Sequence, residues 1–326
     1  MTARRTTSGE RAIAGDEPEP AAAKVEWPAV TVVIPTHNRH ELMAAAVRSV
    51  LAQDYPGPVE CIVVFDREEP FQPPVVIPRD RELRVITNDR TPGPAGAYNA
   101  GVMAATSELV AFLDDDDEWL RSKLRLQVQA LQAHPQSSVA VTGIYLGTGW
   151  RSARIPGREL MTLEYLLRGR RIEVHSSSVM VRRSSYLGEI GLIDEAIPGS
   201  YGEDYDWHLR AARRAPLVAV QKPLVRVRWQ YSYFVDRWRT IIEGLQYQLR
   251  HRPEISEHPR NLARIYGRIA FAYAASGEPA QARKWAGRCV KTDWRELRAY
   301  LAFLVSYRIL RPEFVVRMAH GAGRGV

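Results

Sequence analysis

The sequence has 326 residues, 45% hydrophobic and 25% charged, which is typical of a globular protein with one large domain or two smaller ones. It contains no apolar run of the roughly 18 residues that span a bilayer, and its N-terminus lacks the apolar core of a secretion signal. The two cysteines, Cys61 and Cys289, exclude a disulfide scaffold and a cysteine-based zinc site, and they favour a reducing cytoplasm.

The net charge of +8 is unevenly distributed along the chain. Residues 237–326 hold 17 Lys and Arg against 7 Asp and Glu, a difference of +10, so the preceding residues carry close to −2. Three interpretations are a solvated helical face, contact with an anionic membrane surface, and nucleic-acid binding, the last without any recognisable motif. Residues 298–324 alternate apolar stretches with arginines, which suits a helix lying at a lipid interface.

Residues 1–26 are polar and rich in Ala, Glu, Pro and Arg, and they predict a disordered leader. The next two hundred residues alternate apolar runs typical of buried strands with helical patterns. We expect strands at 29–35, 59–65, 83–86, 108–113, 139–146, 172–181, 217–220 and 224–229, helices at 40–54, 120–133 and 203–214, and a glycine-rich loop at 91–101 that leads into a further helix. Continuous apolar strands alternating with helices predict an α/β fold with a parallel, doubly wound sheet.

After residue 237 the pattern changes to helices only. Residues 265–291 predict two helices joined by Gly277-Glu278-Pro279 and loosely resemble one tetratricopeptide unit. Because a single unit cannot bury its own apolar face, we expect it to pack on the preceding domain. The predicted division is therefore a leader at 1–26, an α/β domain at 27–236 and a basic helical region at 237–326.

Four consecutive aspartates, Asp114 to Asp117, directly follow the apolar run at 109–113. Like charges in a row repel one another, and a hard divalent cation such as Mg²⁺ takes carboxylate and phosphate oxygens as ligands. The carboxyl ends of strands in an open α/β sheet are also where ligands generally bind. The alternative is a solvated acidic loop or helix N-terminus, where carboxylates suit the helix dipole.

Two further acidic groups follow predicted strands or loops, namely Asp66 and Glu203-Asp204 with Asp206. A nucleotide-sugar site needs one acid at the base or ribose, carboxylates for a metal at the diphosphate, and a base for the acceptor hydroxyl. The glycines at 93, 96 and 101 match neither the dinucleotide fingerprint nor the P-loop. Asp66 could instead cap a turn, and Asp204 could be an ordinary acid at a helix N-terminus.

Six segments in this order resemble glycosyltransferase family 2, whose fold is GT-A, a Rossmann-like, mainly parallel sheet flanked by helices. They are TVVIPTHNR (31–39), VVFDREEP (63–70), GPAGAYNAG (93–101), LVAFLDDDDEW (109–119), SSSVMVRR (176–183) and GEDYDWHLR (202–210). The resemblance covers roughly residues 28–232, and the helical region beyond it would be an extension of the GT-A domain.

The resemblance implies a role for each matching residue. It assigns nucleotide-sugar binding to Pro35, Thr36, Asn38, Arg39, Asp66, Asn99, Asp114 and Asp115. The acidic run corresponds to the D-x-D motif, so that Asp114 and Asp116 would hold Mg²⁺ or Mn²⁺, with Asp116 the direct ligand. Asp204 would be the catalytic base, with Glu203 beside it at the acceptor side. Tyr98 stands where arginine is common in relatives, which puts one expected donor contact in question.

The implied reaction is a single inverting displacement on a UDP, dTDP or GDP sugar, with a glycan, a lipid-linked molecule or a small molecule as acceptor. His175, Ser177 and Trp207 are candidates for the acceptor side. A lone histidine in such a position is more often structural, and Trp207 is more often a packing residue. The expected location is the cytoplasm, with peripheral contact to the inner face of the membrane through the basic C-terminus.

Two rival functions remain open from the sequence. A sugar nucleotidyltransferase would also use carboxylates and a metal, but it would be expected to carry a glycine-rich loop with Arg and Lys near the N-terminus, which PTHNR (35–39) matches poorly. A non-catalytic scaffold with a partner-binding helical tail would have no need to keep Asp204 and the acidic run.

Overall fold

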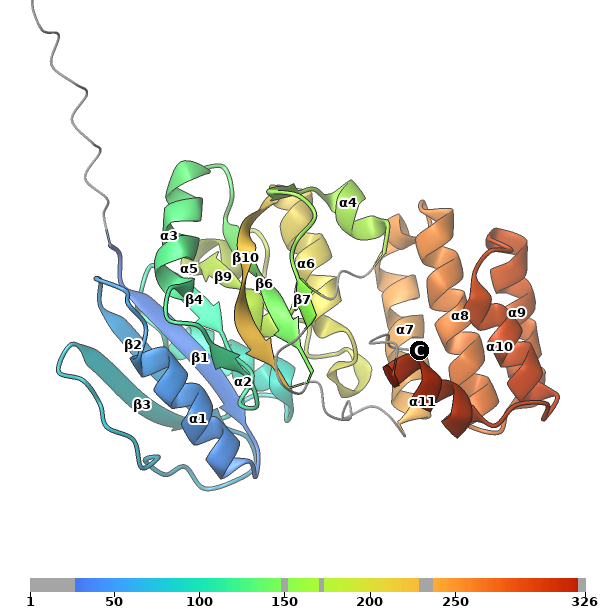
Figure 1. The fold of residues 1–326 in the computed structure, drawn as a ribbon, viewed down its shortest axis with the longest axis horizontal. Coiled ribbons are helices and arrows are strands. Elements are labelled where there is room, and N and C mark those ends of the chain that lie inside the picture. Colours follow the sequence, from blue (N-terminus) through green and yellow to red (C-terminus); the bar gives the residue numbers. More distant parts are fainter. Residues whose placement is uncertain (1–26, 148–151, 170–172, 229–236, 322–326) are drawn as a thin grey trace, which may run out of the picture.

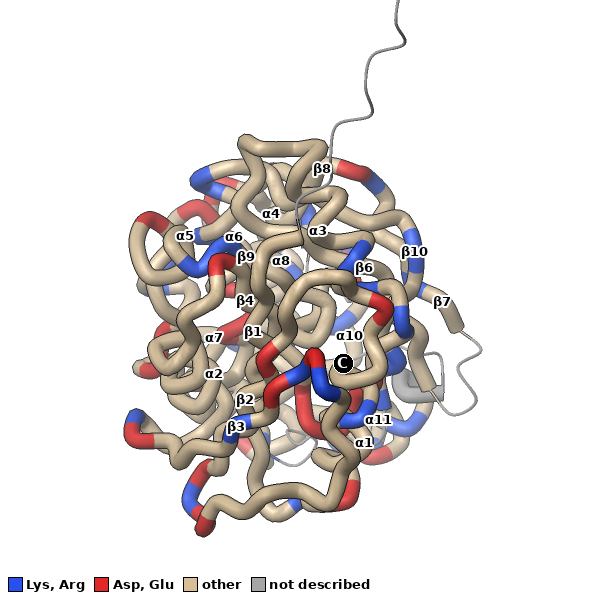
Figure 2. Tube along the Cα trace, turned by 90° about the vertical axis from the view of Figure 1, so that its left-hand side faces the viewer, with Lys and Arg blue, Asp and Glu red and all other residues tan. Residues whose placement is uncertain are grey.

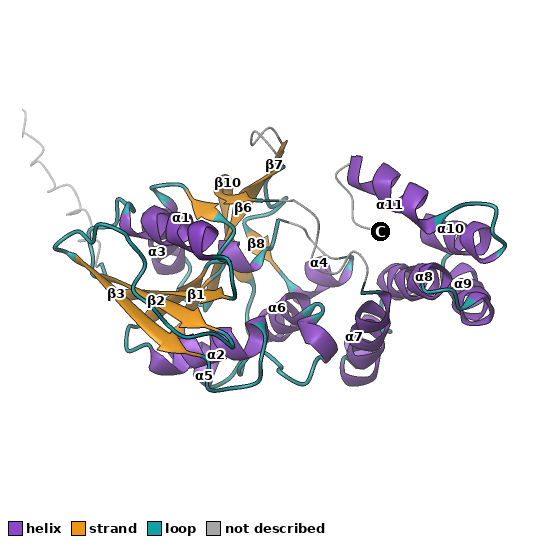
Figure 3. Ribbon diagram, turned by 90° about the horizontal axis from the view of Figure 1, so that it is seen from below, coloured by secondary structure: helices purple, strands orange, loops and turns teal. Residues whose placement is uncertain are grey.

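The computed structural model describes residues 27–147, 152–169, 173–228 and 237–321. The predicted leader at 1–26 lies outside the described residues. The molecule is elongated, with the β-sheet at one end and a group of helices at the other (Figures 1 and 3).

Strands and helices alternate along the chain up to residue 227, and the described residues after that point form helices. The strands are β1 (Val30–Thr36), β2 (Val59–Phe65), β3 (Arg81–Thr87), β4 (Leu109–Phe112), β5 (Glu118–Trp119), β6 (Val139–Leu146), β7 (Ser152–Arg154), β8 (Leu160–Met161), β9 (Met180–Arg182) and β10 (Leu217–Val227). The helices are α1 (His40–Leu51), α2 (Pro94–Ala104), α3 (Lys123–Ala133), α4 (Leu163–Leu167), α5 (Arg183–Leu187), α6 (Glu203–Arg214), α7 (Trp238–His251), α8 (Pro259–Ala275), α9 (Pro279–Thr292), α10 (Leu297–Ser306) and α11 (Pro312–Gly321). Short 3₁₀ turns are η1 (Ser176–Ser178), η2 (Pro198–Ser200) and η3 (Pro253–Ile255).

Within the described residues, ten strands form one mixed, mainly parallel sheet. Its order is β3-β2-β1-β4-β9-β6-β10-β5, with β7 paired to β6 and β8 to β10. The first four strands are mutually parallel, whereas β9 runs antiparallel to both β4 and β6. The predicted α/β class is confirmed, and the sheet has the mixed form expected of the GT-A fold.

Helices cover both faces of this sheet (Figure 3). Helices α1 and α3 pack through Met43, Val47 and Leu124 on one face, in a core cluster with the alternate residues of β1 and β2. Helices α2, α5 and α6 cover the other face. A Cβ on Gly101 of α2 would lie 2.2 Å from Val33 Cγ1, so this glycine permits the close approach of α2 to β1.

The strand predicted at 172–181 is wrong in most of its described length. Residues 176–178 form the turn η1, and only Met180–Arg182 is a strand. The serine hydroxyls offer the backbone and its neighbours local hydrogen bonds, such as Ser178 Oγ to the carbonyl of His175 at 2.7 Å, and these compete with strand pairing. The two strands predicted at 217–220 and 224–229 are one strand, β10, with an irregular register around Pro223, and it ends at Val227.

The predicted pair of helices around Gly277 is confirmed as α8 and α9, and Gly277 makes the turn with φ +81°. Ile265 and Ile269 of α8 lie in the same core cluster as Leu209 of α6, so this pair packs on the α/β domain as expected. Helices α8 to α11 share a second cluster. Two helices, α10 and α11, replace the single interfacial helix suggested at 298–324.

In the described part of the chain, no helix is long and apolar enough to cross a membrane.

Candidate functional site

Three strands deliver polar residues to one edge of the sheet. Thr36 ends β1, Asp66 follows β2, and the acidic run begins two residues after β4. In the parallel register, Thr36 pairs with Phe65 and Val33 with Phe112, so the three carboxyl ends lie side by side. This is the edge at which ligands generally bind in open α/β sheets.

The four aspartates alternate in exposure. The side chains of Asp115 and Asp117 are 0% and 2% exposed, whereas those of Asp114 and Asp116 are 29% and 30% exposed. Two carboxylates therefore point into the protein and two remain accessible. This alternation matches the D-x-D pairing of Asp114 with Asp116 that the resemblance implies.

Asp115 connects the acidic run to the loop after β1. Its carboxylate accepts hydrogen bonds from Thr36 Oγ1 at 2.8 Å and from Arg39 Nε at 3.2 Å, and Arg39 Nη2 lies 2.5 Å from the second oxygen. Burial raises the pKa of the Asp115 carboxyl to about 7, while the Arg39 guanidinium opposes that rise. Asp115 thus holds the acidic run against the end of β1 and the loop that follows it.

Asp117 has a similar supporting position on the other side of the run. It accepts from Ser177 Oγ at 2.6 Å and from the backbone N–H of Arg228 at 3.0 Å, and His175 Nδ1 lies 3.5 Å from its carboxylate. Burial raises the pKa of the Asp117 carboxyl to about 7, while the neighbouring imidazole lowers it. This carboxylate is tied to η1 and to the end of β10.

The two accessible carboxylates have different partners. Asp114 accepts hydrogen bonds from the hydroxyls of Tyr98 and Ser176, the latter at 2.8 Å. Burial and the adjacent Asp114 carboxylate raise the pKa of the Tyr98 phenol well above its ordinary value. Asp116 forms an ion pair of 2.8 Å with Arg39, and burial together with the charge of Asp114 raises the pKa of Asp116.

A group able to hold a metal ion lies at this point. One ligand atom each from Asp114, Asp117 and His175 lie within 4.8 Å of one another. Carboxylate oxygens are the preferred ligands of Mg²⁺, and the crowded, like-charged carboxylates fit a divalent cation. The sequence reasoning did not assign His175 or Asp117 to the metal, because the spacing of 58 residues between them carries no signal.

Asp66 is buried and tied to the glycine-rich loop. Its carboxylate accepts from Asn88 Nδ2 at 2.8 Å, from the backbone N–H of Gly93 at 3.1 Å and from Arg67 Nε at 2.9 Å. Gly93 has φ +118° at the start of α2, a conformation that glycine adopts without a steric penalty. His37 Nδ1 lies 2.6 Å from the carbonyl oxygen of Asp66, which is a structural contact rather than a catalytic one.

Asn99 is fully buried and has partners on every side. Its side-chain nitrogen donates to the carbonyl of Ile193 at 2.9 Å and to Glu195 Oε1 at 2.6 Å, while its oxygen accepts from Tyr186 at 2.6 Å. Asn99 therefore holds the loop at 193–195 against α2. Any effect it has on the nucleotide would be transmitted through this packing.

Of the remaining predicted donor residues, Asn38 lies in the loop after β1 and Pro35 lies within β1. Asn38 has φ +55°, and its backbone N–H donates to Glu68 Oε1 at 2.8 Å, which ties the loop after β1 to the loop after β2. Pro35 lies in β1 beyond Val33, where the pairing with β4 has ended, and a missing N–H is tolerated there.

Glu203 and Asp204 begin α6, directly after Gly202, and both are partly exposed. Trp207, one turn further, is 2% exposed and donates through Nε1 to the carbonyl of Gly191 at 3.0 Å. Its ring lies 6.4 Å from that of Phe112, two residues before the acidic run, so packed aromatic residues connect α6 to β4.

Two predicted acceptor residues do not reach the surface. Ser177 is 0% exposed and supports the acidic run, accepting from the N–H of Asp114 at 3.0 Å and donating to Asp117. Trp207 is a packing residue of the core. Burial thus excludes direct contact of either side chain with an acceptor in this conformation, and only His175, 20% exposed, remains accessible.

Asp206, grouped with Asp204 in the sequence, has a different position. It is 1% exposed, and its carboxylate lies between Arg210 Nε at 3.1 Å and Arg252, whose Nε lies at 2.5 Å. Arg252 follows α7 in the helical region, so this buried ion pair joins α6 to α7. Sequence reasoning could not find it because the two partners are 46 residues apart.

Comparisons with known proteins agree with this geometry. The family model of glycosyl transferase family 2 matches residues 31–190. A relative from Escherichia coli, the UDP-Glc:alpha-D-GlcNAc-diphosphoundecaprenol beta-1,3-glucosyltransferase WfgD, is 29% identical over 102 residues, which cover 31% of this chain and 40% of the relative. The chain thus spans less than half the length of the first curated relatives it matches.

Two solved structures share the fold. TarS residues 1–349 from S. aureus, in complex with UDP-GlcNAc, superimposes with a TM-score of 0.59 at 16% identity, covering 90% of this chain and 92% of that one. The mannosyltransferase PcManGT from Pyrobaculum calidifontis, in complex with GDP-Man and Mn²⁺, gives a TM-score of 0.53 at 16% identity, covering 89% and 83% of the two chains. Both neighbours hold a nucleotide sugar.

Proposed function

Residues 31–190 belong to glycosyl transferase family 2, and from this premise we propose that the chain transfers a sugar from a nucleoside-diphosphate sugar to an acceptor hydroxyl. The observation that carries the proposal is the convergence of Thr36, Asp66 and the acidic run at the carboxyl edge of the sheet. The nucleotide would lie along this edge against Pro35, Asn38, Arg39 and Asp114, while the buried Thr36, Asp66, Asn99 and Asp115 would support the edge from within the fold. The UDP-GlcNAc and GDP-Man complexes of the two structural neighbours support a UDP, dTDP or GDP donor.

We propose that Asp114 and Asp116 hold Mg²⁺ or Mn²⁺, because theirs are the two accessible carboxylates of the run. Asp114 also belongs to the group with Asp117 and His175, so it is common to both ligand sets. A divalent cation bound here supplies charge neutralisation for the departing diphosphate. Arg39 Nη1, which pairs with Asp116 in this structure, would then be available to the diphosphate, while Nε and Nη2 keep their contacts with Asp115.

The catalytic base in this proposal is Asp204, with Glu203 beside it. Its carboxylate takes the proton of the acceptor hydroxyl, and the acceptor oxygen forms a bond to the anomeric carbon of the sugar. The bond between that carbon and the diphosphate oxygen breaks at the same step, and the bonding electrons leave with the nucleoside diphosphate. A single displacement of this kind inverts the anomeric configuration and needs no covalent intermediate with the enzyme.

The acceptor proposed is a lipid-linked molecule. The name of the E. coli relative specifies a diphosphoundecaprenol acceptor, which supports this class. Among the described residues, seven of the thirteen exposed large hydrophobic side chains lie between residues 294 and 318, where five arginines also occur. We propose that this segment contacts an anionic membrane surface from the cytoplasmic side.

Thermal unfolding in the presence of nucleotides tests the donor site. We expect UDP, dTDP or GDP to raise the melting temperature of the full chain when Mn²⁺ or Mg²⁺ is present, and to raise it less with a chelator. If none of these nucleoside diphosphates changes the melting temperature, the proposed donor site is wrong.

A further inference from the structure

The loop that carries Glu203 and Asp204 has an unusual backbone. Gly199, Ser200 and Gly202 all have positive φ, at +58°, +55° and +83°. L side chains rarely adopt this region, and Ser200 is not a glycine. Such a conformation persists only where the surrounding structure determines it.

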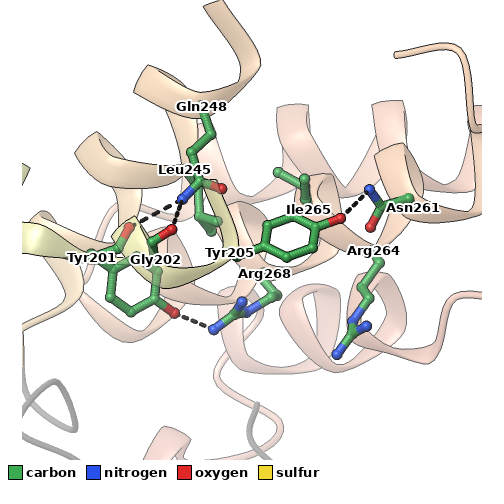
Figure 4. Close-up of a pocket in the computed structure, with 9 residues that line it drawn as sticks. All are labelled: Tyr201, Gly202, Tyr205, Leu245, Gln248, Asn261, Arg264, Ile265 and Arg268. Carbon is green, nitrogen blue, oxygen red and sulfur yellow. Dashed lines mark hydrogen bonds between the residues drawn. The ribbon is translucent and has the colours of Figure 1, made fainter. Parts of the chain in front are cut away.

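The contacts that determine it come from α7. Gln248 is 2% exposed, and its Nε2 donates to the carbonyl of Tyr201 at 3.2 Å and to that of Gly202 at 3.0 Å (Figure 4). Both carbonyls directly precede the first turn of α6. One side chain from the helical region thus fixes the two peptide groups before the proposed base.

Close packing leaves this loop little freedom. A Cβ on Gly202 would lie 2.4 Å from Gln248 Nε2, and one on Gly244 of α7 would lie 2.9 Å from Tyr201 Cβ. The loop, α7 and α8 line a small, partly open pocket of about 20 Å³, which has room for about one water molecule. Any shift of the loop would therefore require α7 to move as well.

Helix α8 supports the same segment from a second side (Figure 4). Asn261 Nδ2 donates to the hydroxyl of Tyr205 at 3.0 Å, and Arg268 donates to the hydroxyl of Tyr201. Tyr201 and Tyr205 flank Asp204 on either side in the sequence. The two helices therefore hold the backbone before the base and the first turn after it.

We propose that Gln248 is a positioning residue for the transfer reaction, acting through the carbonyls of Tyr201 and Gly202 on the orientation of Asp204. The identity of Asp204 as the base rests on the proposed function, whereas the effect of Gln248 on the loop does not. Gln248 of α7 lies in the helical region, so under this proposal the helical region takes part in setting the acceptor side of the site.

Substitution of Gln248 by Met tests this proposal, because Met has a similar shape and no donor. In the full chain we expect kcat to fall tenfold to about a hundredfold, the scale of a misplaced catalytic group, with the donor KM within about twofold of wild type. The matched control is Gln246→Met on the same helix. Gln246 donates to the hydroxyl of Tyr273 on α8 at 3.2 Å and does not touch the loop, so kcat should remain at the wild-type value.

Hydrogen exchange provides a readout that needs no sugar donor. The amide of Asp206, which donates to the carbonyl of Gly202 at 3.1 Å, should exchange faster in Gln248→Met than in Gln246→Met. An inactive wild type would contradict the proposed function, and exchange would still test Gln248. If Gln248→Met does not fold, Asn261→Leu removes the support of Tyr205 and should give the same loss of kcat. Wild-type kcat and exchange in Gln248→Met, or an equal loss of kcat in Gln246→Met, would overturn the proposal.

Discussion

The acidic run and the loop before α6 are two polar regions that are stabilised in different ways. The main side-chain partners of the acidic run, including Thr36, Arg39, Tyr98 and Ser177, come from the family-matched segment. The loop before α6 depends on Gln248, Asn261 and Arg268, all beyond residue 240. The side chains that hold the acidic run therefore lie within the family-matched segment, whereas those that hold the loop before α6 lie in the helical region.

The sheet end of the molecule and the helical region also differ in their distribution of charge. Acidic and basic residues are interspersed over the β3–α1 end of the molecule (Figure 2), while the helical region is strongly basic. In the proposed function, the acidic edge of the sheet binds a divalent cation and the basic helical region contacts an anionic membrane surface.

Among the substitutions at the two regions, Asp204→Asn should cause the largest loss of activity. We expect kcat to fall by about a thousandfold, within the range for loss of general base catalysis, with an unchanged melting temperature and unchanged binding of the nucleoside diphosphate. Asp206→Asn is the control, because it breaks the buried pair with Arg252 and should lower the melting temperature. Normal transfer by Asp204→Asn would show that another group is the base.

Two substitutions at the acidic run distinguish the two candidate sets of metal ligands, Asp114 with Asp116, and Asp114 with Asp117 and His175. Asp116→Asn should weaken Mn²⁺ binding by about a hundredfold, and His175→Ala should weaken it much less, since Asp116 is the more accessible ligand. Calorimetric titration of Mn²⁺ in the presence of UDP measures both. The reverse order of effects would assign the metal to Asp114, Asp117 and His175.

Substitution of the buried Asn99, which holds the loop at 193–195 against α2, should lower the stability of the fold moderately. Asn99→Ala removes the side-chain donor to the carbonyl of Ile193 and the acceptor of the Tyr186 hydroxyl inside the core, and we expect a destabilisation of about 2 kcal/mol. Chemical denaturation measures this change. A neutral result would mean that the loop at 193–195 does not depend on Asn99.

The smallest effect is expected at the basic extension. Serine substitutions at Ile309, Phe314 and Met318 together should weaken binding of the full chain to vesicles rich in phosphatidylglycerol by about tenfold. Serine at Val76 and Ile155, which are also exposed but lie far from this segment in the sequence, is the control. Binding that is unchanged in the triple variant, or a change of oligomeric state instead, would contradict a membrane surface here.

Most of the sheet could be predicted, because apolar β-branched runs such as 59–65 record burial on both faces. The exception at 176–178 arose from serines whose hydroxyls bond to distant carboxylates, a tertiary effect that local pattern does not contain. Similarly, the sequence indicated only that Asp114 and Asp116 form the D-x-D pair, and it did not show why their neighbours are buried. The cause is that Thr36 and Ser177 donate hydrogen bonds to Asp115 and Asp117 inside the protein.

The supports of the acceptor end could not be predicted at all. Gln248 lies 46 residues after Gly202, and a glutamine within an amphipathic helix has many ordinary explanations. One signal was present in the printed sequence: glycines at 199, 202 and 244 mark positions where the loop before α6 and α7 approach each other closely. That signal becomes interpretable only once both segments are known to lie side by side.

The positive φ angles of Gly199, Ser200 and Gly202 have a consequence for the order of events during synthesis. The chain emerges from the ribosome with its N-terminus first, so the donor edge can form before α7 exists. The loop that presents Asp204 gains its supports only after residues 240–268 have emerged and docked. If the proposed function holds, a partly made chain would bind a nucleotide without orienting the acceptor, and catalysis would require the helical region.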